Sequence, residues 1–448
     1  MMTIEEFGRR LRAREITSEQ ITEACLRQIE ADNPRLNAFI TVMADDARRR
    51  ARQADQELAA GRDRGPLHGV PLSIKDLFDI RGLPTTAASH VRDGHIADRD
   101  APAIAHLIQA GAVFVGKTNL HEFAFGTTNE DSAFGPARNP HDPARSPGGS
   151  SGGSAASVAA GMALATIGTD TGGSIRIPAA ACGIVGLKPT LGDVPTGGVV
   201  PLSHTMDHVG PLTQTVADAA LVYHALLGDP HAPIPAPMRV AGLRLAVPRA
   251  YFCDLLDDDV RARFEGALER LQSAGAHVAD VDIHHAADIM PIYLHLQLAD
   301  AAACHAATLD EMPERYTPPV RLRLEMGRYV LAEDYVRALA GREVLKREVD
   351  AALAQHDALV LPTLPIPAPL LGTSTVRIGS STQPVRTVML RLTQGFNVSG
   401  HPAISLPAGL TAGRLPVGVQ LVGCRGQTDG LLRIALACEA LISFKSQV

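Results

Sequence analysis

The pattern of apolar and polar positions predicts a chain in which helices and strands alternate. After Thr17, apolar side chains recur at Ile21, Cys25 and Ile29, which is the spacing of an amphipathic helix. The mostly apolar runs at 70–74 and 358–361 are instead typical of buried strands. Along the whole chain, these patterns predict helices in most of 3–60 and over 101–110, 155–168, 257–274, 286–354 and 429–443, and strands over 35–42, 70–74, 112–115, 243–248, 278–283, 358–365, 403–407 and 417–422. The alternation over 66–283 favours an α/β fold.

Composition narrows the classes of function that this chain can have. A hydrophobic content of 46% with 20% charged residues is typical of a globular protein with an ample core. The net charge of −6, the absence of Trp and an aromatic content of 4% disfavour nucleic acid as a partner. Six scattered cysteines form no C-x-x-C pair, so we expect no structural metal. Without a signal-like N-terminus or 18 consecutive apolar residues, we expect a cytoplasmic protein with no membrane span.

Two glycine- and serine-rich segments, 148–154 and 172–174, are the strongest candidates for chemistry. Such segments are often flexible linkers, but the residues between them are small and apolar, as in a packed core. We therefore predict one buried helix over 155–168, with a serine-bearing turn at each end. Backbone amides near Ser174 could then stabilise an oxyanion. The candidate donors are the amides of Thr171, Gly172, Gly173 and Ser174.

Two further motifs occur in contexts that argue against their usual functions. Residues 111–118 match the phosphate-binding pattern G-x-x-x-x-G-K-[ST], but a phosphate loop follows a strand, whereas here we expect a helix before Gly111. Ser150 and Ser151 both fit G-x-S-x-G, but the proline-rich stretch 138–147 precedes them in place of the apolar strand of an α/β-hydrolase elbow. A Ser–His–Asp arrangement remains open, because the chain has 17 histidines.

A series of motifs along the chain resembles the amidase signature family of hydrolases. The matching segments are GVPLSIKD at 69–76, GGSSGG at 148–153, GTDTGGSIR at 168–176, CG at 182–183, GLKPT at 186–190 and PVGVQL at 416–421. Together they cover nearly the whole chain. Two positions depart from commoner members: Leu77 stands where many have Asn, and 191–193 replace an aromatic residue followed by Gly-Arg.

The resemblance implies a catalytic triad of two serines and a lysine. Ser174 would be the nucleophile, Ser150, preceded by a cis peptide, would relay protons, and Lys75 would be the general base. A lysine accepts a proton only when it is neutral, and burial lowers its pKa toward the working pH. Because Lys75 ends the apolar run 70–74, we expect its ammonium group to be desolvated.

The resemblance also implies the architecture, an α/β/α sandwich with a central mixed β-sheet. We expect a single domain over 1–448. Residues 1–65 would form helices outside the core, 66–225 the signature core with the triad, and 226–448 the remaining core strands together with a variable helical cap at about 286–354.

The expected reaction is hydrolysis of the C–N bond of a small amide or carbamate (urethane) through an acyl-enzyme on Ser174, without a metal or an organic cofactor. The candidate residues for the substrate pocket are Thr127, Thr128, Asn129 and His204, the last in the loop 201–208. Since family members are often dimers, a homodimer is a further expectation.

Two alternatives use the same fold. One is the glutamine-dependent amidase chain of a transamidosome, which releases ammonia from glutamine and works with partner chains on charged tRNA. The other is a catalytically silent binding protein. The intact residues Lys75, Ser150 and Ser174 argue against the silent protein.

Overall fold

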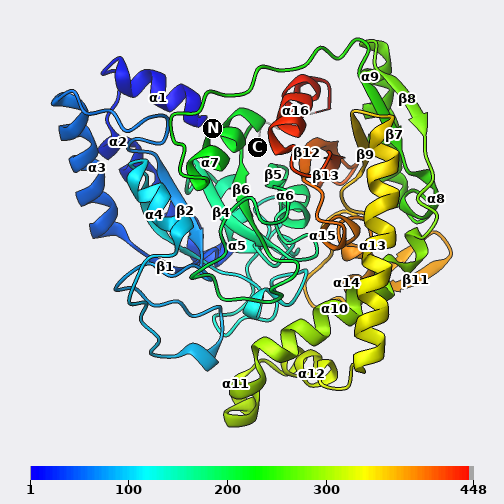
Figure 1. The fold of residues 1–448 in the computed structure, drawn as a ribbon. Helices are drawn as coiled ribbons and strands as arrows, with labels where there is room; N and C mark the ends of the chain where they lie inside the picture. Colours follow the sequence, from blue (N-terminus) through cyan, green and yellow to red (C-terminus); the bar gives the residue numbers. More distant parts are fainter. Residues whose placement is uncertain (1, 443–448) are drawn as a thin grey trace.

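An eleven-stranded mixed sheet forms the centre of the molecule (Figure 1). The computed structural model describes residues 2–442. The strands of the sheet are β1 Phe39–Val42, β2 Pro71–Lys75, β3 Val113–Thr118, β4 Ala165–Asp170, β5 Val185–Lys188, β6 His208–Thr213, β7 Arg244–Val247, β8 His277–Asp280, β9 Ala358–Pro362, β12 Ala403–Leu410 and β13 Pro416–Val422. They lie side by side in the order β1-β3-β2-β4-β6-β5-β12-β13-β9-β7-β8. A separate hairpin consists of β10 Thr375–Ile378 and β11 Ser381–Pro384.

Parallel and antiparallel pairs occupy different parts of this sheet. The triplets β3-β2-β4 and β9-β7-β8 are parallel, and the remaining neighbours are antiparallel. Because β2 and β4 are parallel neighbours, their carboxyl ends lie at the same edge of the sheet. Lys75 is the last residue of β2 and Asp170 the last of β4, so this edge gathers the predicted catalytic segments.

Helices surround the sheet and extend beyond it. They are α1 Ile4–Arg12, α2 Ser18–Leu36, α3 Ala44–Ala59, α4 Pro102–Gln109, α5 Gly152–Ala159, α6 Arg176–Cys182, α7 Val216–Leu226, α8 Arg249–Phe252, α9 Asp258–Ser273, α10 Ile289–Cys304, α11 Ala306–Glu311, α12 Pro318–Gly327, α13 Ala332–Ala354, α14 Val385–Leu390, α15 Gly395–Val398 and α16 Thr428–Ile442. Short 3-10 helices are η1 His90–Arg92, η2 Glu122–Ala124, η3 Ala286–Asp288 and η4 Pro313–Arg315.

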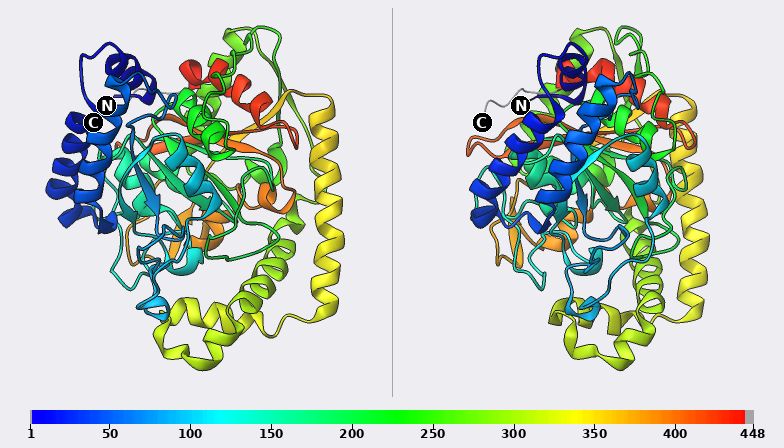
Figure 2. Two further views of the ribbon diagram at one scale, coloured as in Figure 1. Left: turned by 60° about the vertical axis from the view of Figure 1, so that its left-hand side comes forward. Right: turned by 90° about the vertical axis from the view of Figure 1, so that its left-hand side faces the viewer.

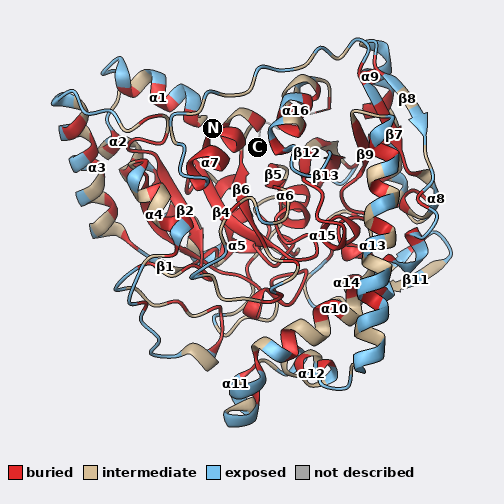
Figure 3. Cartoon of the chain, in the orientation of Figure 1, coloured by how far each residue is buried: buried red, intermediate tan, exposed pale blue. Residues whose placement is uncertain are grey.

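The helices pack in two layers against the sheet. Helices α5 and α6 contact each other and strands β2, β4, β5 and β13, whereas α7, α9 and α16 form a second contiguous group against β5, β6, β9 and β12. Helices α2 and α3 lie at one end of the molecule and α13 at the other (Figures 1 and 2). The deepest burial runs through the central strands, α5 and α6, while the outer faces of α3 and α13 are exposed (Figure 3). The fold is thus the α/β architecture with a mixed central sheet that was predicted.

The prediction of one helix over 155–168 is wrong, and the difference explains how the two serine segments meet. Helix α5 ends at Ala159, Gly161 turns the chain with a φ of 72°, and β4 then runs back through the core. The β-branched Thr166 and Ile167 pair with β2 and β6, which small apolar composition alone did not reveal. A straight helix over 155–168 would have separated the serine turns by about 20 Å.

Most other predicted elements are present within one to four residues of their expected bounds. The capping box at Thr17 is formed, and the expected helical stretch 286–354 contains α10 to α13. The strand expected over 35–42 starts only at Phe39, because α2 continues to Leu36 and Asn37 ends it in the left-handed conformation. The patterns missed β4, β5 and β6, whose segments are rich in glycine. The expected last residue of the final helix, at position 443, lies outside the described residues.

Within residues 2–442, no helix is long and apolar enough to cross a membrane. In the same part of the chain, no group of three or more His, Cys, Asp or Glu side chains is placed to hold a metal ion.

Candidate active site

Lys75 lies fully buried at the carboxyl end of β2. Its Nζ donates to Ser150 Oγ at 2.7 Å and to Thr169 Oγ1 at 2.7 Å. Burial lowers the pKa of Lys75 to about 7, although the carboxylates of Asp207 and Asp170 act in the opposite direction. A large fraction of Lys75 is therefore neutral near pH 7, as a general base requires. The expected desolvation of this side chain is confirmed.

Ser150 follows a cis peptide bond from Gly149, as the family resemblance implied. Ser150 is fully buried and precedes α5. A Cβ at Gly149 would lie 2.9 Å from the amide nitrogens of Thr128 and Asn129, so the backbone of the 127–129 segment packs directly on this glycine. Only glycine permits that approach. The Ser150 hydroxyl is thereby held against Lys75 by two packed backbone segments.

Ser174 stands in the turn between β4 and α6, where its side chain is 6% exposed. The Ser151 amide donates to the Ser174 carbonyl at 3.3 Å, so the two serine segments lie side by side. Among residues 2–442, the amides of Gly172, Gly173 and Ser174 have no hydrogen-bond acceptor. Free amides in such a turn are suited to receive an oxyanion. The structure thus brings together the segments that carry Lys75, Ser150 and Ser174.

A buried ion pair supports the turn from below. Asp170 and Arg176 are both fully buried, and Arg176 donates to the two Asp170 carboxylate oxygens at 3.0 Å each. Asp170 also accepts from the Ile175 amide at 3.1 Å, at the start of α6. Burial alone would raise the pKa of Asp170, but Arg176 outweighs it and holds that pKa well below the usual range. Asp170 therefore occupies the amides that follow Ser174 and leaves those before it free.

Sequence reasoning assigned no role to Asp170 and Arg176, although both stand within the GTDTGGSIR motif. The signal was a carboxylate and a guanidinium flanking a glycine turn inside an otherwise apolar region. A charged pair in such a region is buried only when it is matched, so the motif could have revealed the pair.

The loop 201–208 reaches the same edge of the sheet through Asp207. Thr171 Oγ1 donates to Asp207 Oδ1 at 2.5 Å, and the amides of Leu202 and Ser203 donate to Oδ2. Burial raises the pKa of Asp207, and these three donors oppose that rise. His204, a predicted pocket residue, is exposed on the outside of this loop. Its role in a pocket stays a prediction.

The other predicted pocket residues lie closer to the triad. Thr127, Thr128 and Asn129 are all at least 92% buried, in the segment that packs on Gly149. Asn129 Oδ1 accepts from the Gly153 amide at 3.2 Å, while its Nδ2 is buried without a hydrogen-bond partner. An unsatisfied buried amide is costly and suggests a further acceptor, for which a substrate is one source. Their contact with a substrate stays a prediction.

The phosphate-binding motif at 111–118 does not form a phosphate loop. Residues 113–118 are strand β3, and Lys117 is fully buried. Lys117 Nζ lies 2.6 Å from Asp76 Oδ1 and donates to Thr85 Oγ1 at 2.9 Å. Because its charge is neutralised inside the protein, this lysine is unable to reach a nucleotide.

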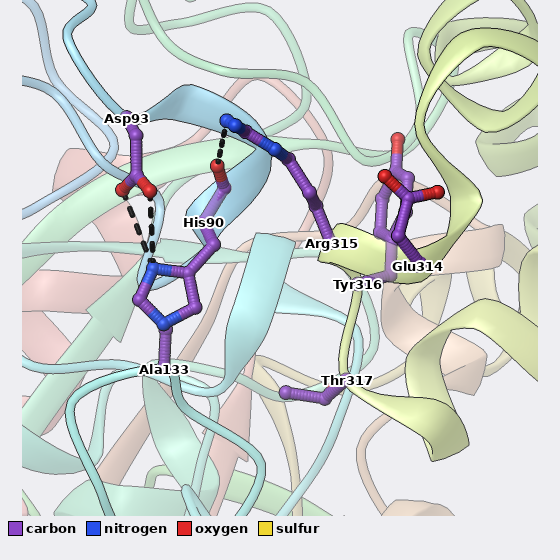
Figure 4. A pocket seen from close by; sticks show the side chains of 7 residues that line it. All are labelled: His90, Asp93, Ala133, Glu314, Arg315, Tyr316 and Thr317. Atoms are coloured by element: carbon purple, nitrogen blue, oxygen red, sulfur yellow. Dashed lines mark hydrogen bonds and ion pairs between the residues drawn. The ribbon is translucent and has the colours of Figure 1, made fainter.

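Surface cavities also lie away from the triad. A cavity of about 450 Å³ is bounded by η1 and η4, with the Asp93 carboxylate facing His90 Nδ1 and Arg315 reaching the His90 carbonyl (Figure 4). A second cavity of about 460 Å³ includes Phe123 and His305. Neither cavity is lined by a member of the predicted triad.

Comparison with known proteins identifies relatives along nearly the full length. The family model described as Amidase matches residues 20–432. A protein named Amidase from Pseudomonas putida is 40% identical, with 92% of this chain and 90% of that protein covered. The first-named (A) chain of the glutamyl-tRNA(Gln) amidotransferase of Carboxydothermus hydrogenoformans is 37% identical over 99% of this chain and 98% of its own. A crystal structure of an amidase superposes with a TM-score of 0.93 at 39% identity, covering 99% of this chain and 100% of that one.

Proposed function

The chain belongs to the amidase family of enzymes that act on C–N bonds, and from this premise we propose that it hydrolyses a small amide or carbamate through an acyl-enzyme on Ser174. The observation that carries the proposal is the hydrogen bond from the buried Lys75 to Ser150, beside the turn that holds Ser174. A serine nucleophile requires a base, and this lysine has the burial that such a base needs.

In the proposed mechanism, Ser174 Oγ attacks the carbonyl carbon, and its proton passes through Ser150 Oγ to neutral Lys75 Nζ. The negative charge that develops on the carbonyl oxygen is stabilised by the amides of the 171–174 turn, of which those of residues 172–174 are free. Ser150 then returns a proton to the departing nitrogen, so that the C–N bond breaks and an ester on Ser174 remains. Water cleaves this ester by the same proton relay and restores the enzyme.

The pKa of Lys75 predicts how activity depends on pH. Below about pH 7 the lysine is protonated and unable to accept a proton, so kcat/KM should rise about tenfold per pH unit there and level off above pH 7. The measurement is the pH profile of kcat/KM for a neutral amide between about pH 5.5 and 8.5. A flat profile across this range would show that Lys75 is not the base.

A panel of substrates tests the proposed reaction and its range. Aryl amides, aliphatic amides, ureas and aryl carbamates are incubated with the purified chain alone, and amine release is measured. We expect at least one class to be hydrolysed, with the Ser174→Ala variant inactive on it. Hydrolysis of the carbamates would extend the activity to urethanes. Silence across every class would contradict a self-sufficient hydrolase.

The alternative of a transamidosome component is favoured by the 37% identity to the Carboxydothermus amidotransferase chain. Such a component would release ammonia from glutamine only with its partner chains. The two functions are distinguished by assaying glutaminase activity of the chain alone and by purifying a tagged chain from its native host. Stable partner chains together with inactivity in isolation would favour the transamidosome, whereas an active homodimer would favour the hydrolase.

A further inference from the structure

Arg386, on α14, joins two segments that flank the reaction centre. Its side chain is half-buried, and its guanidinium donates to the Phe125 carbonyl at 3.3 Å and to Gln297 Oε1 at 3.2 Å. The same guanidinium lies 5.4 Å from the centre of the Phe125 ring. Figure 1 shows α14 next to α10, the helix that carries Gln297.

Both partners of Arg386 lead directly to the triad. Phe125 precedes by two residues the segment 127–129, whose backbone packs on Gly149 before the cis peptide. On the other side, Gln297 Nε2 donates to the Tyr293 hydroxyl, and a Cβ at Gly172 would overlap that hydroxyl. Arg386 therefore connects the segment beside Ser150 with the oxyanion turn before Ser174.

The charge of this region is not balanced. Among the carboxylates of residues 2–442, none lies within 4.0 Å of the Arg386 guanidinium. Arg323 approaches the same Phe125 ring at 5.3 Å, and its nearest carboxylate is Asp131 at 3.5 Å. That carboxylate is shared with His121 Nε2 at 3.0 Å. Two guanidinium groups thus face one aromatic ring with one carboxylate between them.

Burial makes this imbalance costly. It lowers the pKa of Arg386 and lowers that of Arg323 to about 10, because each cation lacks sufficient counter-charge. Burial also lowers the pKa of His121 to about 4, so this imidazole is neutral at pH 7 and adds no further positive charge. A guanidinium has five N–H donors, and the Phe125 and Gln297 acceptors leave three of them free on Arg386. These are enough for a two-point contact with a carboxylate.

We propose that Arg386 binds a carboxylate of the substrate, so that the preferred substrates are amides that carry a free carboxylate group. The inference rests on the proposed hydrolase function and specifies its substrate class. The carboxylate would supply the missing counter-charge and fix the substrate between the 127–129 segment and Tyr293. Arg386 is a binding residue in this proposal, and Arg323 increases the positive potential around it.

The kinetic test uses pairs of substrates that differ only in charge. Succinamate and glutaramate carry a carboxylate, and butanamide and pentanamide are neutral amides of the same length. The wild type should show a kcat/KM about 100-fold higher on the carboxylates. Arg386→Gln should remove this preference, mainly through KM, and change the neutral amides by less than about threefold. Arg386→Lys, which keeps the charge but loses the two-point contact, should restore part of the preference.

Arg391 provides a matched control. It follows α14 directly, is half-buried, and donates only to the Tyr251 carbonyl, at 2.8 Å from Nη2, while stacking on the Tyr251 ring. Arg391→Gln removes an equal charge and should leave the preference for carboxylates unchanged. As a binding test without turnover, calorimetry should detect glutarate binding to Ser174→Ala and no binding to the double variant that also has Arg386→Gln.

The outcomes separate this inference from the proposed function. Ser174-dependent hydrolysis of the neutral amides with no preference for carboxylates would overturn the Arg386 site and leave the hydrolase standing. An equal loss on both substrates in Arg386→Gln, with Arg386→Lys restoring both equally, would also overturn it, because Arg386 would then act only in packing. Absence of any Ser174-dependent hydrolysis would overturn both. Wild-type preference and glutarate binding are measured without the Arg386 variants, so the test survives a variant that fails to fold.

Discussion

Replacement of Ser174 by alanine is expected to lower turnover of the best amide substrate by about 10⁴-fold or more, since the variant has no oxygen to form the acyl-enzyme. The fold should be unaffected. The Ser174 carbonyl, which accepts from the Ser151 amide, is retained in the variant, and the turn is supported by Asp170 and Arg176. The measurement is single-turnover and steady-state amine release, with circular dichroism to verify folding.

Ser157 offers the control for this experiment. It is a fully buried serine on α5, and its hydroxyl contacts Ser73 Oγ and the Ser154 carbonyl at 2.8 and 2.7 Å. Ser157→Ala therefore removes a buried hydroxyl of the same kind outside the proposed relay and should keep most of the activity. Wild-type turnover in Ser174→Ala would rule out Ser174 as the nucleophile. Equal losses in both variants would point to packing in place of chemistry.

The second large effect is on stability, in the Arg176→Met variant. This change should lower the free energy of unfolding by about 3–5 kcal/mol, because it leaves the Asp170 carboxylate buried without its partner. It also removes donors to the Gln420 and Asn397 side chains, at 3.1 and 2.7 Å. The measurement is the urea midpoint and the thermal midpoint of unfolding. Activity should fall as well, since Asp170 positions the turn that carries Ser174.

An exposed ion pair supplies the comparison. Arg249 and Glu265 lie 2.7 Å apart, but their side chains are 41% and 38% exposed. Arg249→Met should therefore cost about 1 kcal/mol or less. Neutralising both buried charges, with Asp170→Asn in addition to Arg176→Met, should recover part of the loss, because no unpaired charge then remains. If Arg176→Met and Arg249→Met were equally stable, the buried pair would have no special contribution.

Much of the candidate site could be predicted from local sequence. The apolar run before Lys75 indicated a buried strand end, and the structure confirms the burial. The glycines at 172 and 173 indicated a turn with free amides, which the structure also contains. These predictions depend on residues close to one another in the chain, where periodicity and turn chemistry are reliable guides.

Other features were not accessible to such reasoning. The small residues at 155–168 were compatible with a helix, and only pairing of Thr166 and Ile167 with two other strands shows that half of this stretch is β4. Arg386 lies in a segment with no motif, and its contact with Phe125 joins residues 261 positions apart. Nothing in the neighbouring residues indicates that this cation lacks a carboxylate.

The sequence by itself determined which groups are available for chemistry and which local elements hold them: the lysine after an apolar run and the serines in glycine turns. Tertiary structure alone decided that α5 and β4 fold back to place the two serine segments side by side, and that Arg386 faces them without a counter-charge. The physical reason is that hydrophobic periodicity reports the burial of a residue in its own element, whereas proximity and charge balance depend on which distant elements pack against it.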